Sequence, residues 1–105
     1  MRKIEQQMVD ALIANKKHWA SGNTQVDCAP DGRSTVHLHG NLIAIIDAGN
    51  VSVTLAGWPT PTTRSRVNTL LGAFGVNARV YQHKGAQWLQ GDSVREIASD
   101  EWVKV

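Results

Sequence analysis

The sequence predicts one α+β domain spanning residues 1–105, in which two helices pack on one face of an antiparallel sheet. Two segments repeat apolar residues at helical spacing, and the segments between and after them alternate apolar and polar residues as strands do. Turns rich in glycine, proline and asparagine separate the alternating segments. The expected order is therefore α-β-β-β-β-α-β-β, in which the strands form a meander and a C-terminal hairpin.

The first helix is expected over residues 3–19, where apolar residues recur at every third or fourth position. Five of them share one face: Ile4, Met8, Val9, Leu12 and Ile13. The helix is expected to stop at residues 21–23, because Gly22 tolerates the left-handed conformation found beyond helix ends.

Four strands are expected next, at residues 24–28, 34–39, 42–46 and 51–55, joined by turns at residues 30–32, 40–41 and 48–50. Side chains of a strand alternate between its two faces, so His37 and His39 are expected to leave the same face. Residues 42–46 are apolar at every position, which is typical of a central strand covered on both sides.

The second helix has the clearest start in the chain. Thr60 can cap a helix whose first residue is Pro61, because proline lacks the N–H that would be unpaired there. One face of this helix is apolar, and Gly75 is expected to end it. Residues on the apolar face are Val67, Leu70, Leu71 and Phe74.

A second hairpin is expected at residues 76–81 and 86–89, around a turn at residues 83–85. Two structures are open for the tail. The spacing of Ser93 and Glu96 favours a capping box and a short helical turn, whereas residues 102–105 favour a closing edge strand.

Composition excludes several classes of protein. Cys28 is the only cysteine, which rules out an internal disulfide and thiolate metal clusters and fits a reducing cytoplasm. The longest apolar run, residues 42–46, is far shorter than the roughly 20 residues of a membrane span. We therefore expect a cytoplasmic protein without a membrane partner.

No catalytic or cofactor motif is found, so we expect a non-enzymatic protein with no cofactor and no resident metal. The chain lacks GxSxG, HExxH and CxxC motifs and has no glycine-rich phosphate loop. His37 and His39 have a spacing that could serve a divalent metal, but His83, Asp27 and Asp47 are third ligands by residue type only. Two partly exposed strand histidines are the alternative reading.

The start of the second helix is the strongest candidate for a binding site. No acidic residue lies between Asp47 and Asp92, whereas this stretch holds several cations. A helix N-terminus attracts anions, and arginine forks suit phosphate groups. The candidate ligand-binding residues are Trp58, Thr62, Thr63, Arg64, Arg66 and Arg79. The alternatives are threonines that only cap the helix beside solvated arginines, or contact with an acidic protein surface.

The chain holds four tryptophans against one phenylalanine and one tyrosine. Tryptophan buries a large area and keeps a polar N–H, so it suits both cores and interfaces. We expect core packing for most of the set and allow one or two to form a partner hot spot. The four are Trp19, Trp58, Trp88 and Trp102.

Several segments resemble small accessory proteins encoded by tailed bacteriophages. The similar segments are residues 1–5, 36–44 (VHLHGNLIA), 55–58 (LAGW) and 62–71 (TTRSRVNTLL). The resemblance implies a protein made in the cytoplasm of an infected bacterium, where such chains bind a host component. Two functions follow as expectations: binding of nucleic acid or another phosphate-bearing ligand through the basic helix tip, or inhibition of a host defence or regulatory protein through tryptophans or a strand edge.

Overall fold

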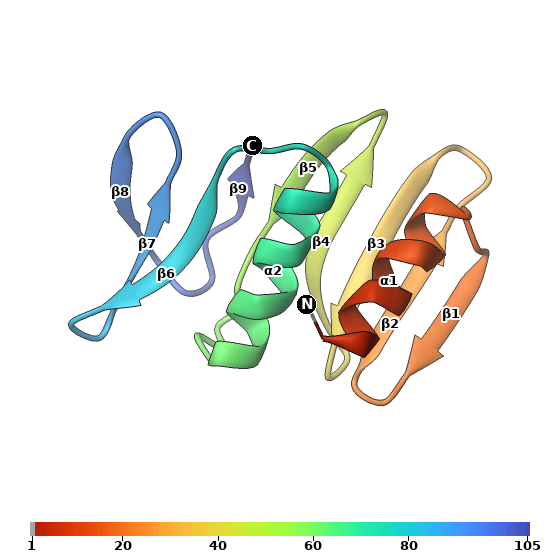
Figure 1. Cartoon of the computed structure of the whole chain (residues 1–105), viewed down its shortest axis with the longest axis horizontal. Helices are drawn as coiled ribbons and strands as arrows, with labels where there is room; N and C mark the ends of the chain where they lie inside the picture. The colour runs from red at the N-terminus through yellow and green to blue at the C-terminus, as the bar shows by residue number, and fades with distance from the viewer. Residues whose placement is uncertain (1) are drawn as a thin grey trace.

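A computed structural model describes residues 2–105; Met1, the first residue of the phage-like opening, lies outside them. It confirms the α+β class, with two helices and nine strands within these residues (Figure 1). The elements are α1 (Lys3–Ile13), β1 (His18–Ser21), β2 (Thr24–Cys28), β3 (Arg33–Leu38), β4 (Asn41–Asp47), β5 (Asn50–Val53), α2 (Pro61–Ala73), β6 (Arg79–His83), β7 (Ala86–Gln90), β8 (Val94–Ile97) and β9 (Val103–Lys104).

A six-stranded antiparallel sheet carries both helices on one face (Figure 1). Its strand order is β1-β2-β3-β4-β5-β9, so the predicted meander is present. Alternate side chains of β2, β3 and β5 are buried, as expected where only one face is covered by helices. The core between the layers includes Met8, Val26, Val36, Ile43, Val53, Val67 and Leu70, each at most 1 % exposed.

The C-terminal hairpin lies in a sheet of its own with the order β6-β7-β8, called here the C-terminal sheet. Residues 94–97 form its third strand rather than a helical turn, so the capping-box reading of the tail is wrong. The other reading is confirmed, because β9 pairs with β5 at the edge of the six-stranded sheet.

The first helix ends at Ile13, six residues earlier than predicted, and the difference comes from Asn15. Its φ of 54° places it in the left-handed region, which asparagine tolerates better than most residues. The N–H groups of Asn15 and Lys16 then donate to the carbonyls of Leu12 and Ala11, at 3.1 and 3.0 Å. These two bonds close the helix, and residues 18–21 are released to form β1.

Two tight turns at one end of the molecule position the candidate site. The turn after β3 has His39 and Gly40 at its centre, with φ of 51° and 78°. It therefore lies one residue earlier than predicted, so His39 has left the strand and does not share a strand face with His37. A second turn places Ala56 and Gly57 at φ of 56° and 79° just before α2.

Candidate functional site

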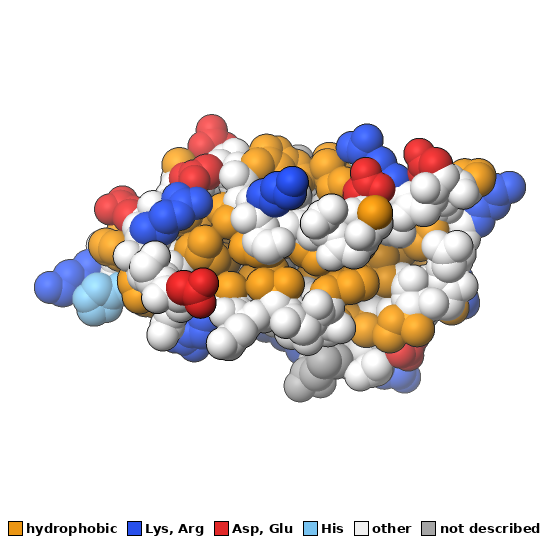
Figure 2. Space-filling model, turned by 90° about the horizontal axis from the view of Figure 1, so that it is seen from above, with side chains coloured by type: hydrophobic (Ala, Val, Ile, Leu, Met, Phe, Trp, Pro, Cys, Tyr) orange, Lys and Arg blue, Asp and Glu red, His pale blue; other side chains and the backbone are white. Residues whose placement is uncertain are grey.

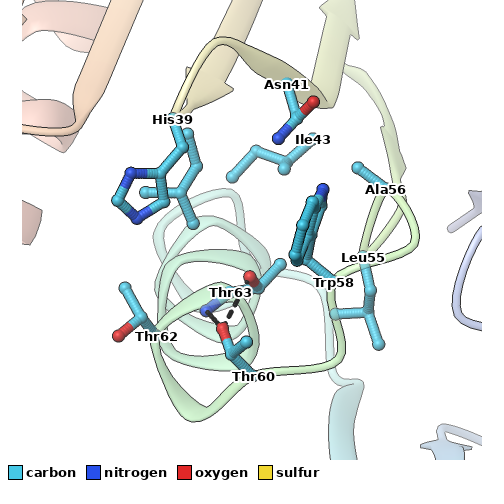
Figure 3. Close-up of a pocket in the computed structure, with 10 residues that line it drawn as sticks. His39, Asn41, Ile43, Leu55, Ala56, Trp58, Thr60, Thr62 and Thr63 are labelled. Carbon is cyan, nitrogen blue, oxygen red and sulfur yellow. Dashed lines mark hydrogen bonds between the residues drawn. The ribbon is translucent and has the colours of Figure 1, made fainter.

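A pocket of about 420 Å³ lies between the turn after β3 and the start of α2 (Figure 3). We call it the Trp58 pocket. Its lining combines apolar side chains with hydroxyl, amide and imidazole groups, and none of the described residues lining it is Lys, Arg, Asp or Glu. The lining residues are Leu38, His39, Asn41, Ile43, Leu55, Ala56, Trp58, Thr60, Thr62 and Thr63.

The indole of Trp58 forms one wall of this pocket, across from His39 (Figure 3). The tight turn before α2 holds it there: the N–H of Trp58 donates to the carbonyl of Leu55 at 2.9 Å, and its carbonyl accepts from Thr60 N–H at 2.8 Å. The side chain is nevertheless 59 % exposed. An exposed tryptophan that forms the wall of a largely apolar pocket is typical of a binding surface.

α2 begins at Pro61 as predicted, and few backbone N–H groups of its first turn are left without a hydrogen-bond partner in the described part of the chain. Thr60 Oγ1 accepts from the backbone N–H of Thr63 at 3.2 Å and lies 3.0 Å from Thr63 Oγ1. Pro61 has no N–H to offer. Of the first three helical residues, only Thr62 keeps an N–H without a partner in the described part of the chain. Because anions bind to free N–H groups at helix starts, this start offers them little.

Arg66 does not reach the helix tip, because its guanidinium is buried in a polar cluster that we call the Arg66 cluster. Nη1 donates to Glu5 Oε2 at 2.8 Å, Nε to Thr24 Oγ1 at 3.1 Å and Nη2 to Asn23 Oδ1 at 3.3 Å. The side chain is 3 % exposed. The expectation of arginines free of any nearby carboxylate therefore does not hold for Arg66, because Glu5 reaches it from a segment distant in the sequence.

The carboxylate of Glu5 is stabilised in its charged form. It is 2 % exposed, and burial alone would raise its pKa. Hydrogen bonds from Ser65 Oγ (2.6 Å), Arg66 (2.8 Å) and the backbone N–H of Arg2 (3.3 Å) oppose this effect. Together with the charge of Arg66 they outweigh it, so the pKa of Glu5 is lowered from its usual 4.5.

Arg64 points toward the C-terminal sheet instead. Its Nη1 donates to the carbonyl of Pro59 at 2.8 Å and to the side-chain oxygens of Gln82 and Gln87 at 3.0 and 3.1 Å. The side chain is partly exposed, and these neutral acceptors leave its charge uncompensated. We call these residues the Arg64 cluster.

Arg79 belongs to neither arginine cluster. Two contacts show that β6 runs antiparallel to α2. The earlier helix residue, Arg64, bonds the later strand residue, Gln82, whereas Asn68 bonds the backbone N–H and C=O of Val80. Arg79 therefore lies toward the far end of the helix, with its guanidinium carbon 5.1 Å from the centre of the Tyr81 ring. The three predicted arginines point three ways, and only Trp58, Thr62 and Thr63 of the predicted site line one pocket.

The sequence reading missed the part of the pocket formed by the turn after β3. His39 and Asn41 flank Gly40 there, and they come from a segment about 20 residues before Trp58. Placing the turn at its correct position would have freed His39 from the strand. Nothing local in the sequence, however, indicates that this turn faces the start of α2.

The described residues contain no group of three or more His, Cys, Asp or Glu side chains that could hold a metal ion. Cys28 is a buried free thiol in β2. No helix in the described part of the chain is long and apolar enough to cross a membrane.

Comparison with known proteins gives one result that covers nearly the whole chain. Residues 1–104 match the model of a phage protein family described as Kyanoviridae Gp96 protein. The chain belongs to this family. Membership in the Gp96 family confirms the resemblance to small phage proteins. No curated protein and no solved structure matches this Gp96 family member.

Proposed function

We propose that this Gp96 family member is a phage accessory protein that binds a host protein in the bacterial cytoplasm, inserting an apolar segment of that partner into the Trp58 pocket. The exposed indole beside a preformed apolar hollow carries the proposal. Tryptophan is the residue most typical of interface hot spots, and a few well-placed polar groups around an apolar floor fix orientation. Asn41 and His39 are such groups here.

The charge of the pocket favours an uncharged segment as its occupant. Among the described residues, a phosphate would meet no Lys or Arg on the lining and, of the first three residues of α2, only the N–H of Thr62 without a partner. An aliphatic or aromatic side chain would instead bury the indole and contact the floor formed by Leu38, Ile43 and Leu55. Removal of apolar surface from water would drive this association.

Binding of nucleic acid or another phosphate-bearing ligand at the helix tip has weaker support. To bind a phosphate there, Arg64 would have to give up its hydrogen bonds to three acceptors, and Arg66 would have to leave its buried ion pair with Glu5. Disrupting a buried pair costs about 3–5 kcal/mol, whereas an exposed ion pair contributes only about 0–1 kcal/mol. The protein-binding function is therefore the one that the geometry favours.

The test compares two exposed tryptophans. Trp58→Ala removes the pocket wall, whereas Trp102→Ala removes an indole that is 44 % exposed and does not line the pocket. Each variant and the wild type would be used to capture partners from a nuclease-treated host lysate. We expect one stoichiometric protein to be retained by wild type and by Trp102→Ala and to be lost by Trp58→Ala.

Calorimetry with the purified partner then gives the size of the effect. A hot-spot tryptophan contributes about 2 kcal/mol or more on truncation, so the dissociation constant should rise about thirtyfold in Trp58→Ala. Circular dichroism must show that both variants remain folded. Equal affinity of the two variants for the partner would contradict the proposal.

A further inference from the structure

The C-terminal sheet has an outer face that nothing in the described chain covers. Alternation along its strands directs the side chains of Val80, Gln82 and Gln87 inward: Val80 is 2 % exposed, and Arg64 of α2 bonds the side-chain oxygens of both glutamines. The opposite set of side chains therefore points away from the helix. Residues on this outer face are Arg79, Tyr81, His83, Ala86, Trp88, Gln90, Val94 and Glu96.

Two aromatic side chains lie side by side at the centre of this face. Tyr81 of β6 and Trp88 of β7 are direct cross-strand partners, and both are partly exposed. Directly opposed residues in an antiparallel pair have Cβ atoms about 5 Å apart, so the two aromatic side chains leave the sheet as neighbours on the same face. The Trp88 Nε1–H bonds the carbonyl of His83 at 3.4 Å and holds the indole near the hairpin turn.

Cations without carboxylate partners border the aromatic pair. Arg79 lies over the Tyr81 ring, and Lys84 occupies the hairpin turn with φ of 52°. Neither makes an ion pair within the described residues, whereas Arg66 and Arg95 both do. Figure 2 shows basic and histidine side chains at the end of the molecule where this hairpin projects in Figure 1.

Glu96 is the acidic residue on this face, and it lies beside Trp88 on β8. Its charge makes the β8 side unfavourable for phosphates. The β6 side, with Arg79 and Lys84, remains favourable, so the face has a cationic border and an acidic border with the aromatic pair between them.

We propose that this outer face binds single-stranded nucleic acid, with bases stacked on Trp88 and on the side of the Tyr81 ring that Arg79 does not cover, and with phosphates along Arg79 and Lys84. Each base presents a π-face to an aromatic side chain, and stacking of this kind tolerates any sequence. A duplex keeps its bases stacked on one another and cannot offer them to the sheet. The face thus selects unpaired strands, and it is separate from the Trp58 pocket.

The first experiment tests stacking with matched variants. Fluorescence anisotropy would follow labelled poly-dT and poly-U strands of about 12 nucleotides, and a hairpin duplex of the same length, at about 50 mM salt. We expect both single strands, or one of them, to bind and the duplex to bind at least tenfold more weakly. Trp88→Phe should retain most of the affinity, whereas Trp88→Leu, which is apolar but has no π-face, should lose about tenfold or more.

The second experiment tests the phosphate contacts. Arg79→Gln and Lys84→Asn, the latter chosen because asparagine accepts the left-handed turn position, should each lower the slope of log K against log salt by about 0.7. Lys16→Gln makes the same charge change at an exposed position after α1 and should leave the slope unchanged.

Three results would overturn the proposal: no binding of either single strand at low salt, equal affinity for the duplex, or equal losses in Trp88→Phe and Trp88→Leu. Capture of a protein by the outer face, lost in Trp88→Leu while both oligonucleotides fail to bind, would assign the aromatic pair to a protein interface instead. None of these outcomes depends on Trp58, so the host-protein proposal stands or falls separately.

Discussion

Arg64 and Arg66 lie two residues apart on α2, yet their guanidinium groups hold together different parts of the molecule. Arg66 is buried and bonds α1 through Glu5, the turn between β1 and β2 through Asn23, and the start of β2 through Thr24. Arg64 is partly exposed and bonds the C-terminal sheet through two glutamines. One arginine joins the helices through a charged partner, and the other joins the helix to the second sheet through neutral ones.

The difference follows from helix geometry. Each residue of an α-helix advances about 100°, so side chains two positions apart point to nearly opposite sides. One side of α2 faces α1 and the other faces β6 (Figure 1). Two arginines at this spacing cannot form one anion-binding fork, whatever their charge suggests in the sequence.

The largest effect is expected when Arg66 loses its guanidinium. Arg66→Met leaves the carboxylate of Glu5 buried without its cation, which destabilises a fold by about 3–5 kcal/mol. Urea unfolding followed by circular dichroism measures the change in the free energy of unfolding. A loss below about 1 kcal/mol would show that the buried pair is not the main link between the two helices.

A matched double variant tests whether charge or packing matters in the same cluster. Glu5→Leu combined with Arg66→Met replaces both charges by apolar groups, and such replacements are often neutral or stabilising. We expect the double variant to recover most of the stability that Arg66→Met loses. Failure to recover would mean that the hydrogen bonds to Asn23 and Thr24 contribute more than the ion pair.

Acid should weaken the Arg66 cluster more than the rest of the molecule. Glu5 has a lowered pKa in the folded protein, so its contribution to stability is present at neutral pH and is lost as the pH falls below its usual value of 4.5. Urea unfolding between pH 7 and pH 3 should show a steeper loss in wild type than in the Glu5→Leu/Arg66→Met variant. Asp27 and Glu101 also have lowered pKa values, but both proteins retain them. If the stability of the two proteins fell equally with pH, the acid sensitivity could not be assigned to Glu5.

A smaller and more local effect is expected at Arg64. Arg64→Met removes the hydrogen bonds that Arg64 donates to Pro59, Gln82 and Gln87. These groups are partly solvated, so the free energy of unfolding should fall by only about 1 kcal/mol. Hydrogen exchange should become faster in β6 and β7 and stay unchanged in β2 and β3. Lys17→Met, at an exposed position, is the control and should change neither region. Uniformly faster exchange would show that Arg64 supports the whole fold.

The sequence predicts local structure here better than it predicts side-chain partners. Gly75 ends α2 as expected, with Val76 N–H bonding the carbonyl of Leu71 at 2.9 Å. Asn15 ends α1 by the same pattern of bonds, but asparagine signals the left-handed position less strongly than glycine, so this end was missed.

The candidate site was harder to predict because it depends on contacts between distant segments. The capping threonine and the position of Trp58 just before the helix were accessible from the sequence, whereas the exposure of Trp58 was not. The partner of Arg66 lies about 60 residues earlier in the chain, and no local pattern in the sequence indicates that α1 packs against α2 with Glu5 facing inward. The spacing of Arg64 and Arg66 was itself sufficient to reject a shared site.

The smallest effect is expected at Arg95 and Glu101, an ion pair with the same 2.8 Å separation as Arg66 and Glu5. Here the side chains are 49 % and 34 % exposed, so water already solvates both charges and little is lost when one is removed. In urea unfolding followed by circular dichroism, Arg95→Met should have the same midpoint as wild type, within error, whereas Arg66→Met should have a lower one. Two ion pairs of equal length would then differ in their effect on stability because one is buried in a hydrogen-bonded cluster and the other is exposed. A marked destabilisation by Arg95→Met would instead show that the link from β8 to the segment before β9 is essential to the fold.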